Sequence, residues 1–251
     1  MKKVALVTGA SAGLGVEFAR QLSKRGHRLV LVARRKDRLE ALANELGNAR
    51  AVAIDLSKAN AAAKLMADLE AAGEQVEMLV NNAGFGLIGR FAELDLKRQR
   101  QMIDLNVGAL TDLCAAVAPG MIRRKSGAIL NVASTAAFQP GPKMAVYFAT
   151  KAYVLSFTEA LHEELKPHGI HVSCLCPGPT RTEFGDVAGF GGNGIFDRVA
   201  MDAADVVETG LAGLDRNHAV VVAGWLNKVT AASTRFASRS IVRKIAGAIK
   251  Y

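Results

Sequence analysis

The first fifteen residues hold an apolar run that ends in a glycine-rich turn. Residues 4–7 favour a β-strand, and Gly9, Gly13 and Gly15 follow at short spacing. Gly9 can end the strand in a tight turn, Gly13 lets backbone N–H groups approach a diphosphate, and Gly15 lets a helix lie close to the sheet. This order predicts the start of a nucleotide-binding βαβ unit. The spacing differs from G-x-G-x-x-G, and a glycine motif alone is a weak signal.

Short apolar runs alternate with longer helical patterns along the chain. We expect strands at residues 3–8, 28–33, 50–54, 76–81, 127–133, 170–176 and 218–223, and helices at about 13–26, 35–46, 58–72, 97–123 and 147–166. The strands are almost wholly apolar, as a parallel sheet covered on both faces requires. The pattern predicts an α/β fold: one doubly wound, Rossmann-type domain over residues 1–224, followed by a basic helical extension over 225–251.

Composition narrows the class of protein. The chain has 251 residues, 50% of them apolar and 22% charged, which is typical of a soluble globular domain. Cys114, Cys174 and Cys176 are odd in number and form no C-x-x-C, so we expect buried thiols in a reducing cytoplasm. No apolar segment precedes the first strand and no stretch approaches the length of a membrane span, which predicts a cytoplasmic protein.

Two further classes of partner are not expected. The five histidines are scattered without ligand spacing, so no metal site is predicted. The run Lys97-Arg98-Gln99-Arg100 is interpreted as the solvated start of a helix. No aromatic residues that could stack on bases are interleaved with it, so no nucleic-acid partner is predicted.

The residues that end the second predicted strand bear on the choice of cofactor. An acid there would hydrogen-bond the ribose hydroxyls of NAD, but the strand ends at Ala33 and continues into Arg34 and Arg35. Paired guanidinium groups suit a 2′-phosphate, which they bind through charge-assisted hydrogen bonds. The pair therefore predicts NADP(H). The alternative is that both arginines are merely solvated.

Ser134, Tyr147 and Lys151 are the candidate catalytic residues. Ser134 directly follows an apolar strand, at the carboxyl end where open parallel sheets bind ligands. Tyr147 and Lys151 are four residues apart, so on a helix both side chains project from one face. An ammonium beside a phenol favours the phenolate and would lower the pKa of Tyr147 toward working pH, which predicts a general acid/base. By itself, the Y-x-x-x-K pair is also common on helix surfaces.

Together with several further motifs, these residues make the chain resemble the short-chain dehydrogenase/reductase family. The motifs that carry the resemblance are Thr8-Gly9-x-x-x-Gly13-x-Gly15, Asn81-Asn82-Ala83-Gly84, Asn106 in Asp104-Leu105-Asn106-Val107, the Ser134, Tyr147 and Lys151 set, and Pro177-Gly178-Pro179-Thr180-Arg181-Thr182. They cover residues 4–182 in the family's order and spacing, and jointly they are highly specific.

The resemblance implies a seven-stranded sheet in the order 3-2-1-4-5-6-7 and hydride transfer between a nicotinamide and a carbonyl or alcohol carbon of a small molecule. It implies that Tyr147 exchanges the proton with the substrate oxygen, that Ser134 hydrogen-bonds this oxygen, and that Lys151 binds the nicotinamide ribose. Asn106 would hold a water in the proton relay. The two long helices would form a homodimer or homotetramer.

The resemblance also assigns residues to the cofactor, with Asp55 near the adenine and Thr182 near the carboxamide. The expected cofactor-binding residues are Gly9, Ser11, Gly13, Leu14, Gly15, Arg34, Arg35, Asp55, Leu56, Asn82, Ala83, Gly84, Tyr147, Lys151, Pro177, Gly178, Thr180 and Thr182.

Two segments fall outside the strand–helix rhythm. Residues 183–200 interleave five glycines with Phe and Val, which predicts a lid over a hydrophobic substrate. The alternative is a flexible surface loop. Residues 216–251 hold seven basic residues and no acid, whereas residues 1–215 are nearly balanced. From residue 238 the pattern is that of a basic amphipathic helix. It could pack on the protein or a neighbouring subunit, or lie at an anionic membrane surface.

These features together predict an NADP(H)-dependent carbonyl reductase or alcohol dehydrogenase that acts on an apolar substrate. One alternative is an NAD-linked dehydrogenase of the same family. Another is a protein that binds or senses NADPH without turning it over and docks through its tail; the intact set of Ser134, Tyr147 and Lys151 argues against it.

Overall fold

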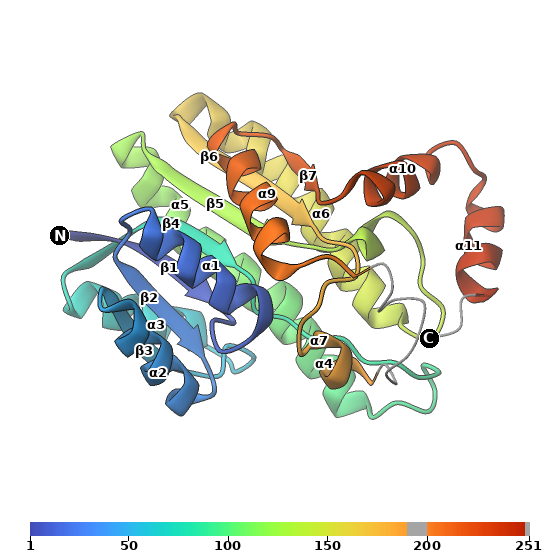
Figure 1. Cartoon of the computed structure of the whole chain (residues 1–251), viewed down its shortest axis with the longest axis horizontal. Coiled ribbons are helices and arrows are strands. Elements are labelled where there is room, and N and C mark those ends of the chain that lie inside the picture. Colours follow the sequence, from blue (N-terminus) through green and yellow to red (C-terminus); the bar gives the residue numbers. More distant parts are fainter. Residues whose placement is uncertain (190–199, 249–251) are drawn as a thin grey trace.

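The computed structural model describes residues 1–189 and 200–248, and it shows a parallel sheet between two layers of helices (Figure 1). The strands are β1 (Lys2–Thr8), β2 (Leu29–Ala33), β3 (Ala49–Ala53), β4 (Glu74–Asn81), β5 (Gly127–Val132), β6 (Ile170–Cys176) and β7 (Val220–Val222). They pair in the order β3-β2-β1-β4-β5-β6-β7, and every pairing is parallel. This confirms the predicted fold class and strand order.

Helices cover both faces of the sheet. On one face lie α1 (Gly13–Lys24), α2 (Lys36–Leu46) and α9 (Ala203–Asp215), and on the other lie α3 (Ala61–Ala71), α5 (Leu110–Arg124) and α6 (Ala145–Leu165). Side chains of β1 alternate between the two apolar cores: Val4 and Leu6 pack with α3, α5 and α6, and Ala5 and Val7 pack with α1, α2 and α9. Two buried faces explain why the strands are apolar throughout.

The helix predicted at 97–123 is longer and less regular than expected. α4 (Leu96–Ile103) runs through a π-helical turn (Asp104–Ala109) directly into α5. The 29 residues from Leu96 to Arg124 are long and apolar enough to cross a membrane by length and composition. The expectation that no segment has that length was therefore wrong. In this fold Leu113, Val117 and Met121 are buried in the core, which accounts for the apolar character of the helix.

Two helices, the short α7 (Phe184–Ala188) and α9, were not predicted, and residues 183–200 were predicted only as a lid. The rest of the expected lid, residues 190–199, lies outside the described residues. Short 3-10 turns occur at Thr135–Phe138 and Lys166–His168.

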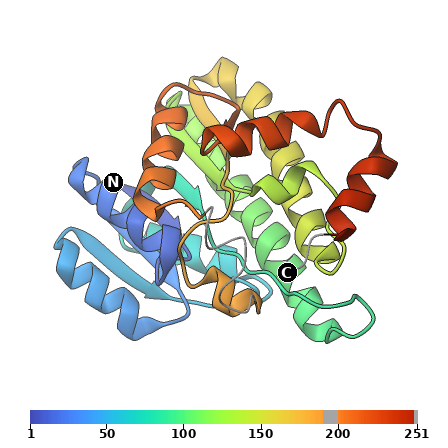
Figure 2. The same cartoon turned by 45° about the vertical axis from the view of Figure 1, so that its right-hand side comes forward.

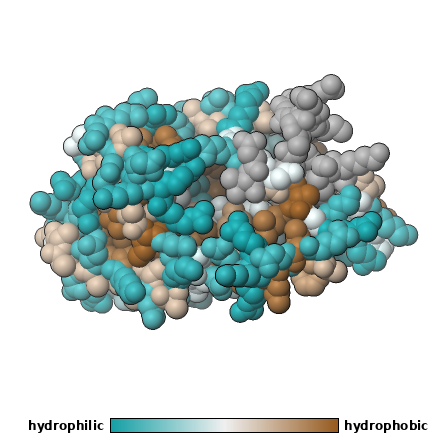
Figure 3. All heavy atoms as spheres, turned by 90° about the horizontal axis from the view of Figure 1, so that it is seen from below, coloured by the Kyte–Doolittle hydropathy of each residue, from teal (hydrophilic) through white to brown (hydrophobic). Residues whose placement is uncertain are grey.

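The basic extension forms two helices, α10 (Trp225–Ser233) and α11 (Arg239–Ala248). The predicted amphipathic helix from residue 238 is thus confirmed as far as residue 248, and residues 249–251 lie outside the described residues. Figure 2 shows α10 leading away from β7 and α11 at the edge of the molecule, where Figure 1 also places it. Seen from below, apolar patches interrupt an otherwise largely polar surface (Figure 3).

Candidate active site

A cavity of about 710 Å³ lies at the carboxyl ends of the strands. It is lined by all but two of the predicted site residues: Gly9, Ser11, Gly13, Leu14, Arg34, Arg35, Asp55, Leu56, Asn82, Ala83, Gly84, Ser134, Tyr147, Lys151, Pro177, Gly178, Thr180 and Thr182. Gly15 and Asn106 do not line it. The fold thus brings residues from most of the chain's length to one place, where open α/β sheets bind ligands.

The glycine turn leaves the N-terminus of α1 open toward the cavity. Gly13 has a φ of +52°, in the left-handed region that favours glycine. A Cβ on Gly15 would overlap the carbonyl oxygen of Gly9, so only glycine allows α1 to start this close to the turn. No side chain caps α1 at Ala12, and its first turn holds no acid. The free N–H groups and the positive end of the helix dipole therefore suit an anion such as a diphosphate.

The three candidate catalytic side chains come from β5 and α6. Ser134 follows the end of β5, and its Oγ accepts a hydrogen bond from Ala136 N at 3.1 Å. Tyr147 and Lys151 lie one turn apart on α6, and both are buried. The Lys151 ammonium donates a 2.8 Å hydrogen bond to Val132 O, and it lies 5.8 Å from the centre of the Tyr147 ring. The predicted phenol, ammonium and hydroxyl therefore share one site.

The pKa of the Tyr147 phenol differs from expectation. Burial raises it to about 12, against a smaller lowering by a hydrogen bond with Ser134. Burial also lowers the pKa of Lys151 to about 8. The expectation that Lys151 brings the pKa of Tyr147 down was therefore wrong for the protein alone, because burial of the phenol dominates its pKa. Near neutral pH the phenol stays protonated and the lysine stays mainly cationic.

Asn106 lies in the π-helical turn, behind the cavity wall. Its Nδ2 donates to Phe85 O at 3.0 Å and to Thr150 Oγ1 at 3.1 Å, and its Oδ1 accepts from Phe85 N at 3.1 Å. In the structure the carboxamide thus fixes the backbone next to Gly84 and ties it to α6. This is a positioning role, and the water-holding role that the family resemblance implies for Asn106 stays a prediction.

Comparison with known proteins places this site in a family. The family model described as short chain dehydrogenase matches residues 3–188. The chain belongs to the short-chain dehydrogenase/reductase family. An uncharacterized oxidoreductase of Staphylococcus epidermidis is 32% identical over 209 residues, which cover 82% of this chain and 88% of that protein. A very-long-chain 3-oxoacyl-CoA reductase of Phaeosphaeria nodorum is 36% identical over 180 residues, 68% of this chain and 53% of that protein.

Solved structures give the same result over the whole chain. A short-chain dehydrogenase from Sphingobium yanoikuyae in complex with NADPH has a TM-score of 0.84 and 34% identity, and the alignment covers 100% of this chain and 99% of that one. The bulky-bulky ketone specific alcohol dehydrogenase from Comamonas testosteroni has a TM-score of 0.78 and 30% identity, with 100% and 97% covered. This short-chain dehydrogenase/reductase is thus an oxidoreductase that uses a nicotinamide cofactor.

Arg35 of the predicted arginine pair forms an ion pair with Glu183, which was not predicted as a site residue. Arg35 donates to Ser11 Oγ at 3.2 Å and to Ser11 O at 3.0 Å, and it pairs with Glu183 at 3.0 Å. Arg38 pairs with the other oxygen of Glu183 at 2.6 Å. Arg34 also lines the cavity. Burial acts to raise the pKa of Asp55, but hydrogen bonds from Ser57 and then the charge of Arg34 hold it below its usual value. No sequence motif marks Glu183, because both of its partners lie in the N-terminal part of the chain, far from it in sequence.

An apolar wall beside Tyr147 was also missed. Phe85, Met144 and Phe148 are buried and cluster with Tyr147, and the ring of Phe184 lies 5.5 Å from the Tyr147 ring between centres. All four line the cavity. Met144 and Phe148 flank Tyr147 at the start of α6, whereas Phe85 and Phe184 come from distant segments, so no single local pattern predicts the whole wall. The Phe-containing stretch after residue 183 was the only signal available.

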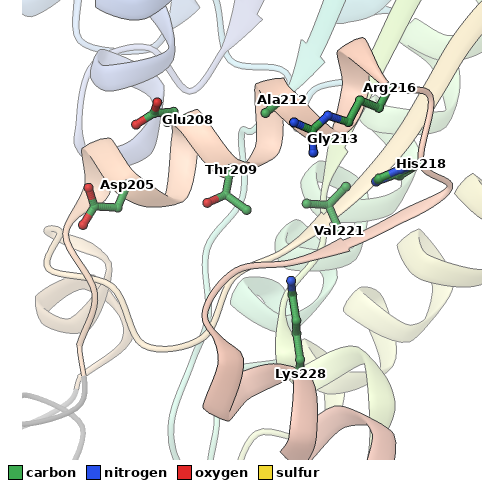
Figure 4. Close-up of a pocket in the computed structure, with 9 residues that line it drawn as sticks. All are labelled: Asp205, Glu208, Thr209, Ala212, Gly213, Arg216, His218, Val221 and Lys228. Carbon is green, nitrogen blue, oxygen red and sulfur yellow. The ribbon is translucent and has the colours of Figure 1, made fainter.

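A second hollow, of about 520 Å³, lies between α9, β7 and α10 (Figure 4). Asp205 and Glu208 stand toward one end of it, Arg216 and His218 stand toward the other, and Lys228 points toward Val221 from α10. It contains none of the predicted site residues. Its lining carries charges of both signs but no tyrosine, so the combination of phenol, ammonium and hydroxyl found in the first cavity does not occur there.

Proposed function

We propose that this chain transfers a hydride between NADP(H) and a carbonyl or alcohol carbon of an apolar substrate, as a carbonyl reductase or alcohol dehydrogenase. One observation carries the proposal: Ser134, Tyr147 and Lys151 line one cavity together with Arg34 and Arg35. The first three residues suit proton transfer at an oxygen, and the arginines suit a phosphate on the adenine ribose.

The proton chemistry follows from the burial of the site. A nicotinamide supplies the hydride when it is bound. Tyr147 is protonated at neutral pH, since its pKa is raised to about 12, and it can donate its proton to the substrate oxygen as negative charge develops there. The Ser134 hydroxyl can donate a hydrogen bond to the same oxygen. The Lys151 ammonium, 5.8 Å from the Tyr147 ring, stabilises the phenolate that results.

The preference for NADP(H) rests on charge. The side chain at the end of β2 is Ala33, so no carboxylate is there to hydrogen-bond the ribose, and two guanidinium groups follow directly. A similar structure holds NADPH. Titration of wild type and Arg34→Ala with NADPH and NADH tests this, because the preference for NADPH should collapse in the variant. Equal affinity of wild type for both cofactors would favour the NAD-linked alternative.

The apolar substrate is inferred from the wall of Phe85, Met144, Phe148 and Phe184 beside the phenol. The similar alcohol dehydrogenase from Comamonas testosteroni is specific for bulky-bulky ketones, and the similar reductase from Phaeosphaeria nodorum acts on very-long-chain 3-oxoacyl-CoA. We therefore expect hydrophobic ketones to be better substrates than small polar carbonyls.

The enzyme proposal is tested by NADPH oxidation with a panel of ketones and aldehydes. Tyr147→Phe should lower kcat by about 10²- to 10⁴-fold, as expected for loss of a general acid. Tyr153→Phe is the matched control, because Tyr153 lies on the same helix but outside the cavity. If Tyr147→Phe oxidises NADPH as fast as wild type, the non-catalytic NADPH-binding alternative is favoured.

We further propose that the protein forms a homodimer or homotetramer through α5 and α6. Tyr153 on α6 is partly exposed, stacks on Phe157, and hydrogen-bonds Thr111 on α5, so the two helices share an outward-facing aromatic surface. Sedimentation of wild type and Tyr153→Asp tests this proposal, and the variant should dissociate if the surface is an interface.

A further inference from the structure

The C-terminal segment buries little of its surface on the rest of the protein. Over residues 225–248 only Ala231, Val242 and Ala246 are buried. α10 contacts β7 and the 3-10 turn at Thr135–Phe138, and α11 lies beside Pro142. Both cartoon views show α11 at the margin of the molecule (Figure 2). Packing on the body therefore uses only one narrow side of α11.

Large apolar side chains are concentrated on the outer surface of this segment. Six of the ten exposed large apolar residues in the described chain occur here: Trp225, Leu226, Val229, Phe236, Ile241 and Ile245. Trp225 is 76% exposed and Phe236 is 90% exposed. Ile241 and Ile245 are one helical turn apart and share a side, next to the side that buries Val242 and Ala246. An apolar patch of this kind marks an interaction site.

The charges around these residues have one sign. Residues 216–251 contain seven basic residues and no acid. Arg235, Arg239, Arg243 and Lys244 are exposed, and no carboxylate within residues 1–189 and 200–248 lies within 4.0 Å of them. Lys228 instead points into the hollow between α9 and β7 (Figure 4). The expected partner is therefore anionic.

We propose that α10, residues 234–238 and α11 form a docking surface for an anionic lipid bilayer, which we call the tail surface. Trp prefers the boundary between headgroups and acyl chains, and Phe and the neighbouring aliphatic residues add the apolar area that an interfacial helix buries. Four exposed cations beside them can bind acidic headgroups. This proposal is independent of the proposed enzymatic function. It extends the predicted contact region from residues 238–251 back to α10.

Charge and side-chain chemistry distinguish the bilayer from other partners. A symmetric contact with a second copy would bring four cations against four cations with no acid from either segment, which is unfavourable. Nucleic acid would match the charge, but Leu226, Val229, Ile241 and Ile245 have no π-face on which bases could stack. A bilayer satisfies both the cations and the aliphatic side chains.

Co-sedimentation with vesicles tests the proposal. Wild type should sediment with vesicles made of two parts phosphatidylcholine and one part phosphatidylserine, and less with phosphatidylcholine alone or at about 1 M salt. Each cation near an anionic surface contributes about fivefold, so Arg239→Gln, Arg243→Gln and Lys244→Gln combined should weaken binding by about 100-fold. Trp225→Ser with Phe236→Ser should reduce binding at every phosphatidylserine content.

The matched control removes three charges elsewhere. Lys64, Lys97 and Arg100 are exposed residues on α3 and α4, and their combined change to Gln should leave binding within about twofold. Circular dichroism establishes that all variants are folded. Absence of wild-type binding, or equal loss in the control, overturns the proposal. A change of oligomeric state in the Trp225 and Phe236 variant, or binding to duplex DNA in place of vesicles, also overturns it.

Discussion

Glu183 and Arg35 form an ion pair, Oε2 to Nη1 at 3.0 Å, that joins the segment after β6 to the end of β2. The second carboxylate oxygen pairs with Arg38 on α2. Hydrogen bonds from Arg38 and Arg35 lower the pKa of Glu183, so the carboxylate is anionic at neutral pH. An anion therefore already stands where we propose that the cofactor's 2′-phosphate binds. The next residue, Phe184, contacts Tyr147, so one short segment reaches both the arginines and the phenol.

We predict that Glu183→Gln tightens NADPH binding by about two- to fivefold and leaves NADH binding nearly unchanged. Each exposed ion pair of Glu183 is worth about 0–1 kcal/mol. In the variant the 2′-phosphate no longer competes with Glu183 for the arginines, so the free energy of NADPH binding becomes more favourable by about that amount. Fluorescence titration of both cofactors measures the change. Glu45→Gln is the control, because Glu45 pairs with Arg20 outside the cavity. Weaker NADPH binding in Glu183→Gln would mean that the acid orients Arg35 instead of competing for it.

The strands could be predicted because each is a short apolar run, whereas their order came from the family resemblance and not from periodicity. α9 was missed because Gly210 and Gly213 lower its helix propensity. Both glycines lie against the sheet, where a Cβ would collide with Leu175 or Val221. Close packing on the sheet therefore overrides the propensity.

The candidate site was predictable where motifs are local, as with the glycine turn and the Tyr147 and Lys151 pair. Glu183 and the apolar wall depend on contacts between distant segments, which no single window of sequence shows. The pKa of Tyr147 was predicted in the wrong direction because burial cannot be read from a spacing of four residues.

We predict that the buried ammonium of Lys151 lowers the free energy of unfolding, although the enzyme needs this residue for activity. Its pKa is about 8 in the fold, below the ordinary value of 10.5, so the unfolded chain binds more protons between these pH values. The free energy of unfolding should therefore rise with pH across that window. Lys151→Met should remove this dependence and raise the unfolding free energy at pH 7 by about 1–3 kcal/mol, with activity lost. Urea titrations at pH 7 and pH 10 measure both effects.

Lys97→Met, at an exposed position on α4, is the control and should change neither quantity. If Lys151→Met is less stable than wild type at pH 7, the hydrogen bond to Val132 O outweighs the burial of the charge.

The closeness of Gly15 to Gly9 makes a prediction about cofactor binding. In Gly15→Ala the new methyl group overlaps the Gly9 carbonyl, so α1 must move away from the turn. We expect the free energy of unfolding to fall by about 1–3 kcal/mol and NADPH affinity to fall at least tenfold, because the helix N-terminus loses its alignment. Thermal unfolding and fluorescence titration measure the two. Gly108→Ala is the control, because a Cβ on Gly108 meets no atom within 4 Å and the residue lies on the long helix. Gly26→Ala would not be an equivalent control, since Gly26 has a positive φ.

A buried polar network holds together the elements that carry the site. Asn131 on β5 accepts a hydrogen bond from Asn81 Nδ2 on β4 at 2.9 Å and donates one to Thr158 Oγ1 on α6 at 3.0 Å. Asn81 precedes Asn82 of the cavity wall, Asn131 lies three residues before Ser134, and Thr158 shares a helix with Tyr147. Asn131→Ala leaves Asn81 and Thr158 without these partners in a fully buried place, which should cost about 2–4 kcal/mol of unfolding free energy.

A double-mutant cycle tests whether the network acts as a unit. Asn81→Ala alone leaves the Asn131 carbonyl oxygen without its amide donor, so it should also be destabilising. Because both single variants break the same hydrogen bond, the loss of stability in the double variant should be smaller than the sum of the two by about 0.5–3 kcal/mol. Urea denaturation of the four proteins gives the coupling. Strict additivity would show that β4 and β5 are held in register by their backbone pairing alone, and that the site does not depend on these amides for its alignment.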